Sequence, residues 1–166
     1  EPRLLAEWQR RRPREPLDTV YYGGGTPTAF SERALERLVA PVLGAGPPRS
    51  GEVSMECNPS TLSDAKARLL RDLGVTRLSI GAQSFDPAVL RALGRSHSPA
   101  CIRACVEAAR RAGFARVNLD LIFGVPGQSG DSWRATLRAA LDLAPDHLSC
   151  YSLTYEEDTE FFRRFQ

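Results

Sequence analysis

Short runs of apolar and polar residues alternate along the chain, and helix-like segments separate them. The β-type runs cover residues 19–22, 52–57, 77–83, 117–123 and 147–153. Helical periodicity is found at residues 2–12, 32–43, 63–74, 99–112 and 129–143. The order is therefore one helix, four strand–helix units and a last strand. This order predicts an α/β fold whose parallel strands are joined by right-handed crossovers.

The predicted helices begin and end at residues with the right chemistry. Ser31 and Ser63 are expected N-caps, because a hydroxyl at that position accepts from a free backbone N–H of the first turn. Gly74 and Gly113 are expected just past two helix ends, where glycine adopts a left-handed conformation easily. The loop at residues 44–51 is rich in glycine and proline and is interpreted as a surface connection within one domain.

Within the strands, the alternation separates two faces. Asn118 and Asp120 oppose three aliphatic residues, and Ser79, Gly81 and Gln83 likewise oppose an aliphatic set. The aliphatic face is expected to carry the helices, and the polar face is expected to meet water or a ligand. A closed barrel normally fills its interior with branched aliphatic side chains, so this pattern favours an open barrel with a ligand at its mouth. The alternative is a hydrogen-bonded polar layer inside a closed barrel.

Composition narrows the class of protein. The chain has 166 residues, of which 42% are hydrophobic and 25% charged, and this is enough for one domain with a core. Its 22 basic and 20 acidic residues give a net charge of +2, which does not favour nucleic-acid binding. No apolar run approaches the ~20 residues that span a bilayer, and no signal peptide opens the sequence. We therefore expect a cytoplasmic protein.

Four cysteines are present, and none is assigned as a metal ligand. Cys101 and Cys105 are four residues apart on a predicted helix and share a face. Two thiols without a third or fourth ligand make a poor site for zinc or iron–sulfur, so packing on the helix face is favoured.

The stretch VYYGGGTPT at residues 20–28 raises the question of what approaches its backbone. It lacks the lysine of a Walker A loop, and Thr28 stands where a Rossmann loop needs its third glycine. Neither phosphate nor dinucleotide binding is therefore supported. What remains is either a tight turn or an exposed backbone edge that offers its carbonyls to an ammonium group.

Five motifs carry a resemblance to a known family. They are VYYGGGTPTAFS, MECNPSTL, RLSIGAQSFDPAVLRALGRSH, VNLDLIFGVPGQ and HLSCYSLTYEEDT. In order and spacing, they resemble the radical S-adenosylmethionine (SAM) enzymes of the oxygen-independent coproporphyrinogen III oxidase group. Within that group, Gln83-Ser84-Phe85 and the run Gly94 to His97 look more like the HemW heme chaperones, whereas the oxidases tend to show Gln-Asp-Phe and Asn-Arg.

The resemblance implies a partial (βα)6 TIM-like barrel over residues 1–166 and a set of SAM-binding residues. Gly24, Gly25, Thr26 and Glu56 would receive the methionine ammonium. Gln83 and Asp120 would bond the ribose hydroxyls, Arg95 would take the carboxylate, and Thr154 would lie near the adenine. Each also has a structural interpretation: Arg95 as a surface ion-pair partner, for example, or Glu56 as a helix cap. Asp120 is hardest to explain structurally, because a carboxylate between leucines is costly without a partner. His97, Trp8 and Trp133 are interpreted as structural.

One family feature is missing from the sequence. The family holds a [4Fe–4S] cluster on a C-x-x-x-C-x-x-C loop after its first strand, and no such spacing occurs here. The resemblance thus implies an internal fragment that lacks the first strand, the cluster loop and the C-terminal region, with an open sheet edge at residues 19–22. We expect the chain as given to be inactive, and we assign no catalytic residue.

The resemblance implies a HemW-like heme chaperone as the parent protein, with SAM and a [4Fe–4S] cluster as cofactors. Heme or porphyrin and a heme-recipient protein would be its partners in porphyrin metabolism. One alternative is a coproporphyrinogen III oxidase that produces protoporphyrinogen IX. Another, from a different class, is a non-catalytic partial barrel that binds a small nucleoside-like ligand. A cluster motif upstream would exclude the last alternative, and a heme-binding tail downstream would separate the first two.

Overall fold

The computed structural model describes residues 2–44, 46–158 and 162–163. The strands are β1 (Thr19–Tyr22), β2 (Glu52–Cys57), β3 (Arg77–Gln83), β4 (Arg116–Phe123) and β5 (His147–Ser152). The α-helices are α1 (Pro2–Arg11), α2 (Glu32–Leu43), α3 (Asp64–Asp72), α4 (Pro87–Ala92), α5 (Pro99–Arg111) and α6 (Gly130–Leu141). Two short 3-10 turns, η1 (Pro27–Ala29) and η2 (Pro59–Thr61), follow β1 and β2. Among the described helices, none is long and apolar enough to cross a membrane.

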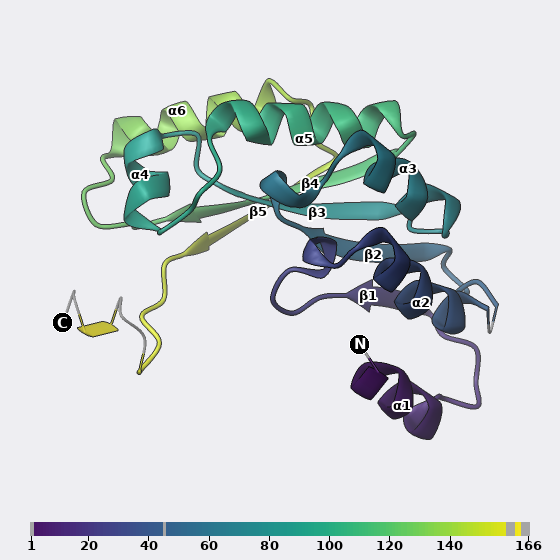
Figure 1. Ribbon diagram of the computed structural model, residues 1–166. Helices are drawn as coiled ribbons and strands as arrows, with labels where there is room; N and C mark the ends of the chain where they lie inside the picture. Colours follow the sequence, from purple (N-terminus) through teal and green to yellow (C-terminus); the bar gives the residue numbers. More distant parts are fainter. Residues whose placement is uncertain (1, 45, 159–161, 164–166) are drawn as a thin grey trace.

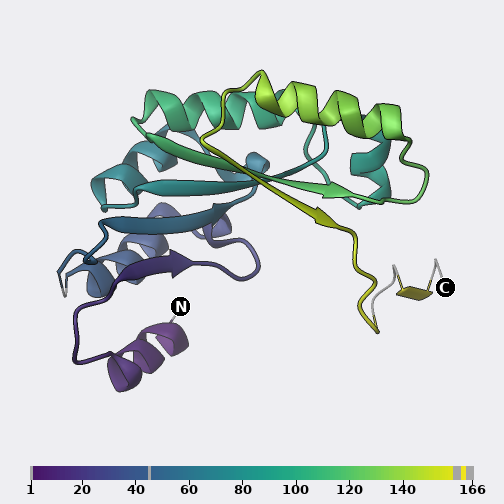
Figure 2. The same ribbon diagram turned by 180° about the vertical axis from the view of Figure 1, so that it is seen from behind.

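The five strands form one parallel sheet in the order β1-β2-β3-β4-β5. Helices α2, α3, α5 and α6 lie along one face of this sheet, and α1 lies near α2 at the β1 end (Figure 1). Figure 2 shows the same layers from behind, with β5 at the edge of the sheet beside β4. The predicted α/β class and its parallel strand–helix units are confirmed.

The core lies between the sheet and its helices. The aliphatic residues of β3 and β4, among them Leu78, Ile80, Leu119 and Leu121, are fully buried there. They are the members of the alternating pattern that oppose the polar positions, so the predicted division of the faces holds. Leu70 of α3 is also fully buried, which fits a helix that rests its apolar stripe on the sheet.

The predicted helix ends agree with the structure at most positions. The Ser31 and Ser63 hydroxyls accept from the backbone N–H of Ala34 and Lys66, at 3.3 and 3.1 Å. Gly74 and Gly113 have φ of +97° and +85°, as expected for residues just past a helix end.

Other bounds differ from the predictions. The predicted helix 129–143 spans only Gly130–Leu141, because Ser129 is its N-cap and Asp142 its C-cap. The short helix α4, which Asp86 caps, was not predicted, since six residues give little periodic signal. Strand β4 begins one residue before the predicted start, and β5 ends at Ser152 instead of Leu153.

The polar face is not uniformly open. Ser54, Ser79 and Asn118 are buried, and Asn118 and Ser79 are hydrogen-bonded to each other. Toward the carboxyl ends of the strands, the same face opens into a pocket. The described strands form an open sheet, as favoured, and not the closed barrel of the alternative. Part of the polar face is nevertheless a hydrogen-bonded layer, and only its carboxyl end forms a space for water or ligand.

Candidate binding pocket

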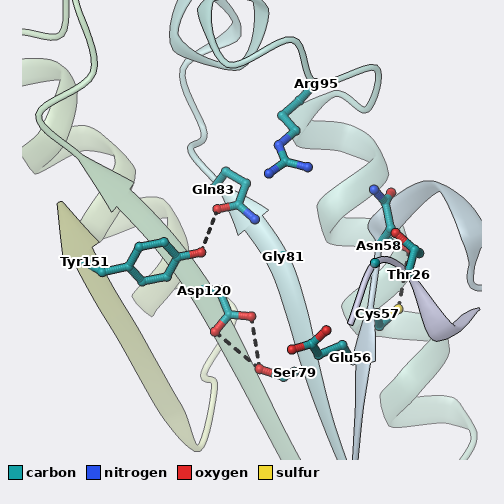
Figure 3. A pocket seen from close by; sticks show the side chains of 11 residues that line it. Thr26, Glu56, Cys57, Asn58, Ser79, Gly81, Gln83, Arg95, Asp120 and Tyr151 are labelled. Carbon is teal, nitrogen blue, oxygen red and sulfur yellow. Dashed lines mark hydrogen bonds between the residues drawn. The ribbon is translucent and has the colours of Figure 1, made fainter. Parts of the chain in front are cut away.

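A pocket of about 190 Å³ lies where the parallel strands end. Figure 3 shows its side chains converging from β2, β3, β4, β5 and the loop after α4. Its lining residues are Gly25, Thr26, Glu56, Cys57, Asn58, Ser79, Gly81, Gln83, Arg95, Asp120 and Tyr151. The carboxyl edge of a parallel sheet is where α/β folds build their ligand sites.

Glycine is required at the three positions after β1 for two different structural reasons. A Cβ on Gly23 would stand 2.5 Å from Cε1 of the Tyr21 ring, so only glycine allows that ring to lie against the loop. Gly24 and Gly25 have φ of +87° and +62°, a region that side chains with a Cβ rarely adopt. The loop therefore needs glycine for a tight turn and for close packing.

Glu56 is held by the loop beside it. Its Oε1 accepts a hydrogen bond from the Tyr21 hydroxyl at 2.7 Å, and its Oε2 accepts from the Gly24 backbone N–H at 2.9 Å. Burial, and then the hydrogen bond and negative charge of Glu56, raise the pKa of Tyr21 to about 12. The carboxylate is thus oriented at the rim of the pocket, and it is not a helix cap.

Gln83 is the strained residue of the site. Its φ is +66°, and the pairing of β3 with β4 shifts register between Ile80 and Gln83. Gly81 makes room for the folded-back amide, because a Cβ there would stand 2.8 Å from Gln83 Nε2. The Tyr151 hydroxyl donates to Gln83 Oε1 at 3.2 Å (Figure 3). Strain of this kind persists where the surrounding structure imposes it and is often found at functional sites.

Asp120 lies on the floor of the pocket with partners on its sheet side. The Ser79 hydroxyl donates to Oδ2 at 3.0 Å, and the Asn118 amide donates to Oδ1 at 2.7 Å. A carboxylate between two leucines needs hydrogen-bond donors, and Ser79 and Asn118 of the same protein supply two of them. Its side chain is nonetheless part of the pocket wall.

Arg95 reaches the pocket from the loop between α4 and α5 (Figure 3). Two residues further, the buried imidazole of His97 lies 3.1 Å from the carbonyl oxygen of Ala82, at the end of β3. Burial lowers the pKa of His97, with Arg95 adding to this and the bond to Ala82 opposing it. His97 is therefore structural, as predicted, and ties the Arg95 loop to the strand that bears Gln83.

Most of the predicted site residues come together, and one does not. Gly25, Thr26, Glu56, Gln83, Arg95 and Asp120 all line the pocket. Gly24 lies beside it through its bond to Glu56. Thr154 is exposed, two residues past the end of β5, and does not line the pocket. Asn58 and Tyr151 also line the pocket and were not predicted, although alternation along β5 places Tyr151 on the polar face.

The described residues contain no group of three or more His, Cys, Asp or Glu side chains that could hold a metal ion. The Cys57 and Cys105 sulfurs lie 3.9 Å apart within the hydrophobic core, where the bond to Cys57 and burial raise the pKa of Cys105. Cys105 thus packs inward from its helix, as predicted. Cys101 is partly exposed and Cys150 is exposed on β5. The cysteines of this chain therefore do not fit a [4Fe–4S] cluster.

The amino-acid sequence of this chain is similar to those of heme chaperones and of coproporphyrinogen III oxidases. The HemW heme chaperone of Bacillus subtilis is 39% identical over 152 residues, which cover 90% of this chain and 40% of that protein. The HemW of Escherichia coli is also 39% identical, over 89% of this chain and 39% of its own length. The oxygen-independent coproporphyrinogen III oxidase of Bradyrhizobium diazoefficiens is 38% identical over 97% of this chain and 36% of its own.

Among solved structures, coproporphyrinogen III oxidase (HemN) from Escherichia coli superposes with a TM-score of 0.82 at 32% identity. The match covers 92% of this chain and 36% of that one. The chain thus spans about 40% of the length of the curated relatives. The sequence model of the radical SAM superfamily matches residues 1–140 of this chain. With this match and the shared fold, the chain belongs to the radical SAM superfamily.

Proposed function

We propose that the pocket binds S-adenosylmethionine and that residues 1–166 are the core domain of a HemW-like heme chaperone. The observation that carries this proposal is the set of groups that converge on one pocket: a glycine loop, two carboxylates, an amide and a guanidinium. S-adenosylmethionine presents complementary groups, namely an ammonium, a carboxylate and two ribose hydroxyls. The donor set of the pocket therefore fits this ligand.

Each side chain has a role that its chemistry supports. Asp120 has its sheet side occupied by Ser79 and Asn118 and accepts from the ribose hydroxyls, with Gln83 beside it. The Arg95 guanidinium takes the ligand carboxylate, since a planar fork suits a planar anion. The ammonium is received by Glu56 together with the loop Gly24, Gly25 and Thr26. Thr154 stays a proposed residue near the adenine, outside the pocket wall.

In the intact protein, we propose a [4Fe–4S] cluster held by cysteines other than the four in this chain. Heme is proposed as a further ligand and a heme-recipient protein as a partner, in the cytoplasm. Two observations favour the chaperone: the run Gln83-Ser84-Phe85 and the similarity to HemW proteins from several bacteria. The second candidate, a coproporphyrinogen III oxidase, is favoured by the match over 97% of the chain and by the fold of HemN.

Anaerobic titration calorimetry of the intact protein with S-adenosylmethionine tests the ligand. Arg95→Ala should weaken binding by about tenfold or more, because the ligand loses a charge-assisted hydrogen bond. Arg91→Ala is the matched control, since Arg91 is exposed on α4 and does not line the pocket. Equal effects of the two changes, or no binding by the unaltered protein, would contradict the proposed ligand.

A second experiment separates the two activities. In one reaction the intact protein is incubated anaerobically with reductant, S-adenosylmethionine and coproporphyrinogen III, and in a second it is mixed with heme and heme binding is followed by absorbance. The chaperone interpretation predicts a heme spectrum and no protoporphyrinogen IX. Accumulation of protoporphyrinogen IX would support the oxidase instead.

A further inference from the structure

A chain of hydrogen bonds crosses the polar face from the pocket to the opposite end of the sheet. It begins at Asp120 on the pocket floor, passes through the fully buried Asn118 and ends at His147, the first residue of β5. The distances are 2.7 Å from Asn118 Nδ2 to Asp120 Oδ1 and 2.6 Å from His147 Nδ1 to Asn118 Oδ1. His147 is exposed and does not line the pocket.

In this row of hydrogen bonds, each bond has a defined donor and acceptor. Asn118 Oδ1 can only accept, so His147 Nδ1 must carry the proton of their bond. The other end of the amide, the NH2 group, then faces the Asp120 carboxylate and the Ser79 hydroxyl, each at 2.7 Å. Its two protons satisfy both, and the Ser79 hydroxyl donates its own proton to Asp120 Oδ2.

The opposite orientation of the amide is unfavourable. It would turn Oδ1 of Asn118 toward the Asp120 carboxylate, so that two acceptors faced each other where the observed orientation has a 2.7 Å hydrogen bond. Ser149 does not decide between the two orientations, because its hydroxyl lies 3.0 Å from Asn118 Nδ2 and 3.2 Å from Oδ1. A buried amide with both ends occupied in this way has one stable orientation.

We propose that Asn118 is a positioning residue that orients Asp120 toward the ligand, and that His147 fixes the orientation of Asn118 from outside the pocket. This inference rests on the proposed function, in which Asp120 accepts from the ligand. Because Ser79 and Asn118 bind the carboxylate on its sheet side, the remaining lone pairs of Asp120 face the pocket. Glu56, Arg95 and Tyr151 share the pocket with Asp120, and none of them replaces these two donors.

A double-mutant cycle distinguishes positioning from general stability. Affinity for S-adenosylmethionine is measured by anaerobic calorimetry on the intact protein, its Asp120→Asn and Asn118→Leu variants and the double variant. Each single change should weaken binding about tenfold, the effect of one hydrogen bond to a charged group. Asn118→Leu should add almost nothing when Asp120 is already changed, because the two residues act as a unit. A merely structural Asn118 would instead weaken both backgrounds equally, and that result would overturn the inference.

His147→Phe provides a second test, because it removes the bond to Asn118 without changing Asn118, Ser79 or Asp120. It should weaken binding by about threefold in the unaltered protein and not in the Asp120→Asn background. Arg116→Ala is its matched control, because Arg116 is also exposed at that end of the sheet, paired with Glu52 at 3.3 Å. This control should not change the affinity, and a change equal to that of His147→Phe would contradict the proposal.

The cycle also separates this inference from the proposed function. If Asp120→Asn leaves the affinity unchanged, the proposed site is wrong and the inference falls with it. If Asp120→Asn weakens binding while Asn118→Leu and His147→Phe do not, the site stands and only the positioning role is overturned.

Discussion

The backbone N–H of Gly24 donates to Oε2 of Glu56 across 2.9 Å, and this bond fastens the loop after β1 to the end of β2. The other carboxylate oxygen is bound by the Tyr21 hydroxyl at 2.7 Å. Both bonds come from β1 and its loop, so one carboxylate joins these two segments to β2. The sequence VYYGGGTPT therefore forms one side of the pocket together with a residue 32 positions further along the chain.

Glu56→Gln should weaken S-adenosylmethionine binding by about tenfold, because a neutral amide is a poorer partner for an ammonium than a carboxylate. The affinity is measured by anaerobic calorimetry on the intact protein. Glu36→Gln is a control, since Glu36 is exposed on α2 and does not line the pocket. An unchanged affinity in Glu56→Gln would remove Glu56 from the ligand site.

The same substitution should lower the pKa of Tyr21 from about 12 toward its usual value near 10, because the carboxylate of Glu56 is one of the groups that raise it. Because folding raises the pKa of Tyr21, its contribution to the free energy of unfolding is fully present below pH 10 and is lost as the pH rises toward 12. The difference in phenolate absorbance between Glu56→Gln and the unaltered protein measures this shift. Identical titration curves would mean that Glu56 does not influence Tyr21.

Asp120→Ala should weaken S-adenosylmethionine binding by roughly 1–3 kcal/mol, because the ligand hydroxyls lose a charged acceptor. The substitution also leaves the Ser79 hydroxyl and the Asn118 amide without their acceptor, so thermal stability should be recorded alongside affinity. Asp142→Ala is a suitable control, since Asp142 is exposed at the end of α6. Equal affinities for the two variants would exclude Asp120 from the site.

The buried His97 predicts a pH effect on stability. Burial lowers the pKa of His97 below its usual 6.5, so the folded state disfavours the charged imidazole. The stabilisation is therefore present above pH 6.5 and is lost as the pH falls below that value toward the lower pKa of the folded state. The Nδ1 atom of His97 has no hydrogen-bond partner among the described residues, and a proton there would be buried beside Arg95.

Urea denaturation at pH 7.5 and pH 5 measures this effect. His97→Gln should lose less stability than the unaltered protein between the two pH values, because glutamine does not titrate. Comparison of the two differences removes the contribution of the carboxylates, which both proteins share. A larger loss in His97→Gln would show that the imidazole is not the responsible group.

Much of the fold follows from local patterns. The short β-type runs predicted β1, β2 and β3 at their observed bounds, and in β2 and β3 alternation also predicted an apolar face and a polar face. Serine caps marked the starts of α2 and α3 for an equally local reason. Helix α4 escaped prediction because its six residues make less than two turns, too few to show a periodic stripe.

The site was only partly predictable. Glu56, Gln83 and Asp120 could be expected to converge, since parallel strands end at the same edge of a sheet. The left-handed backbone of Gln83 and its bond to Tyr151 depend on the shifted register between β3 and β4, which no local pattern encodes. Thr154 was placed by family position alone, and it lies two residues past the end of β5, outside the pocket wall.

The last prediction concerns the four cysteines. Residues 1–166 should not assemble a stable [4Fe–4S] cluster and so should not cleave S-adenosylmethionine, because such a cluster needs three thiolates that meet at one point. Cys57 and Cys105 meet each other in the core, on the helix side of the sheet, while Cys150 is exposed on β5. Cys101 lies one turn before Cys105 on α5, and it does not complete a group of three metal-binding side chains among the described residues. Anaerobic reconstitution with iron and sulfide, followed by desalting, iron analysis and a 5′-deoxyadenosine assay, measures this directly. A stoichiometric cluster that survives desalting, or 5′-deoxyadenosine that depends on reductant, would show that these thiols are not held where the structure puts them.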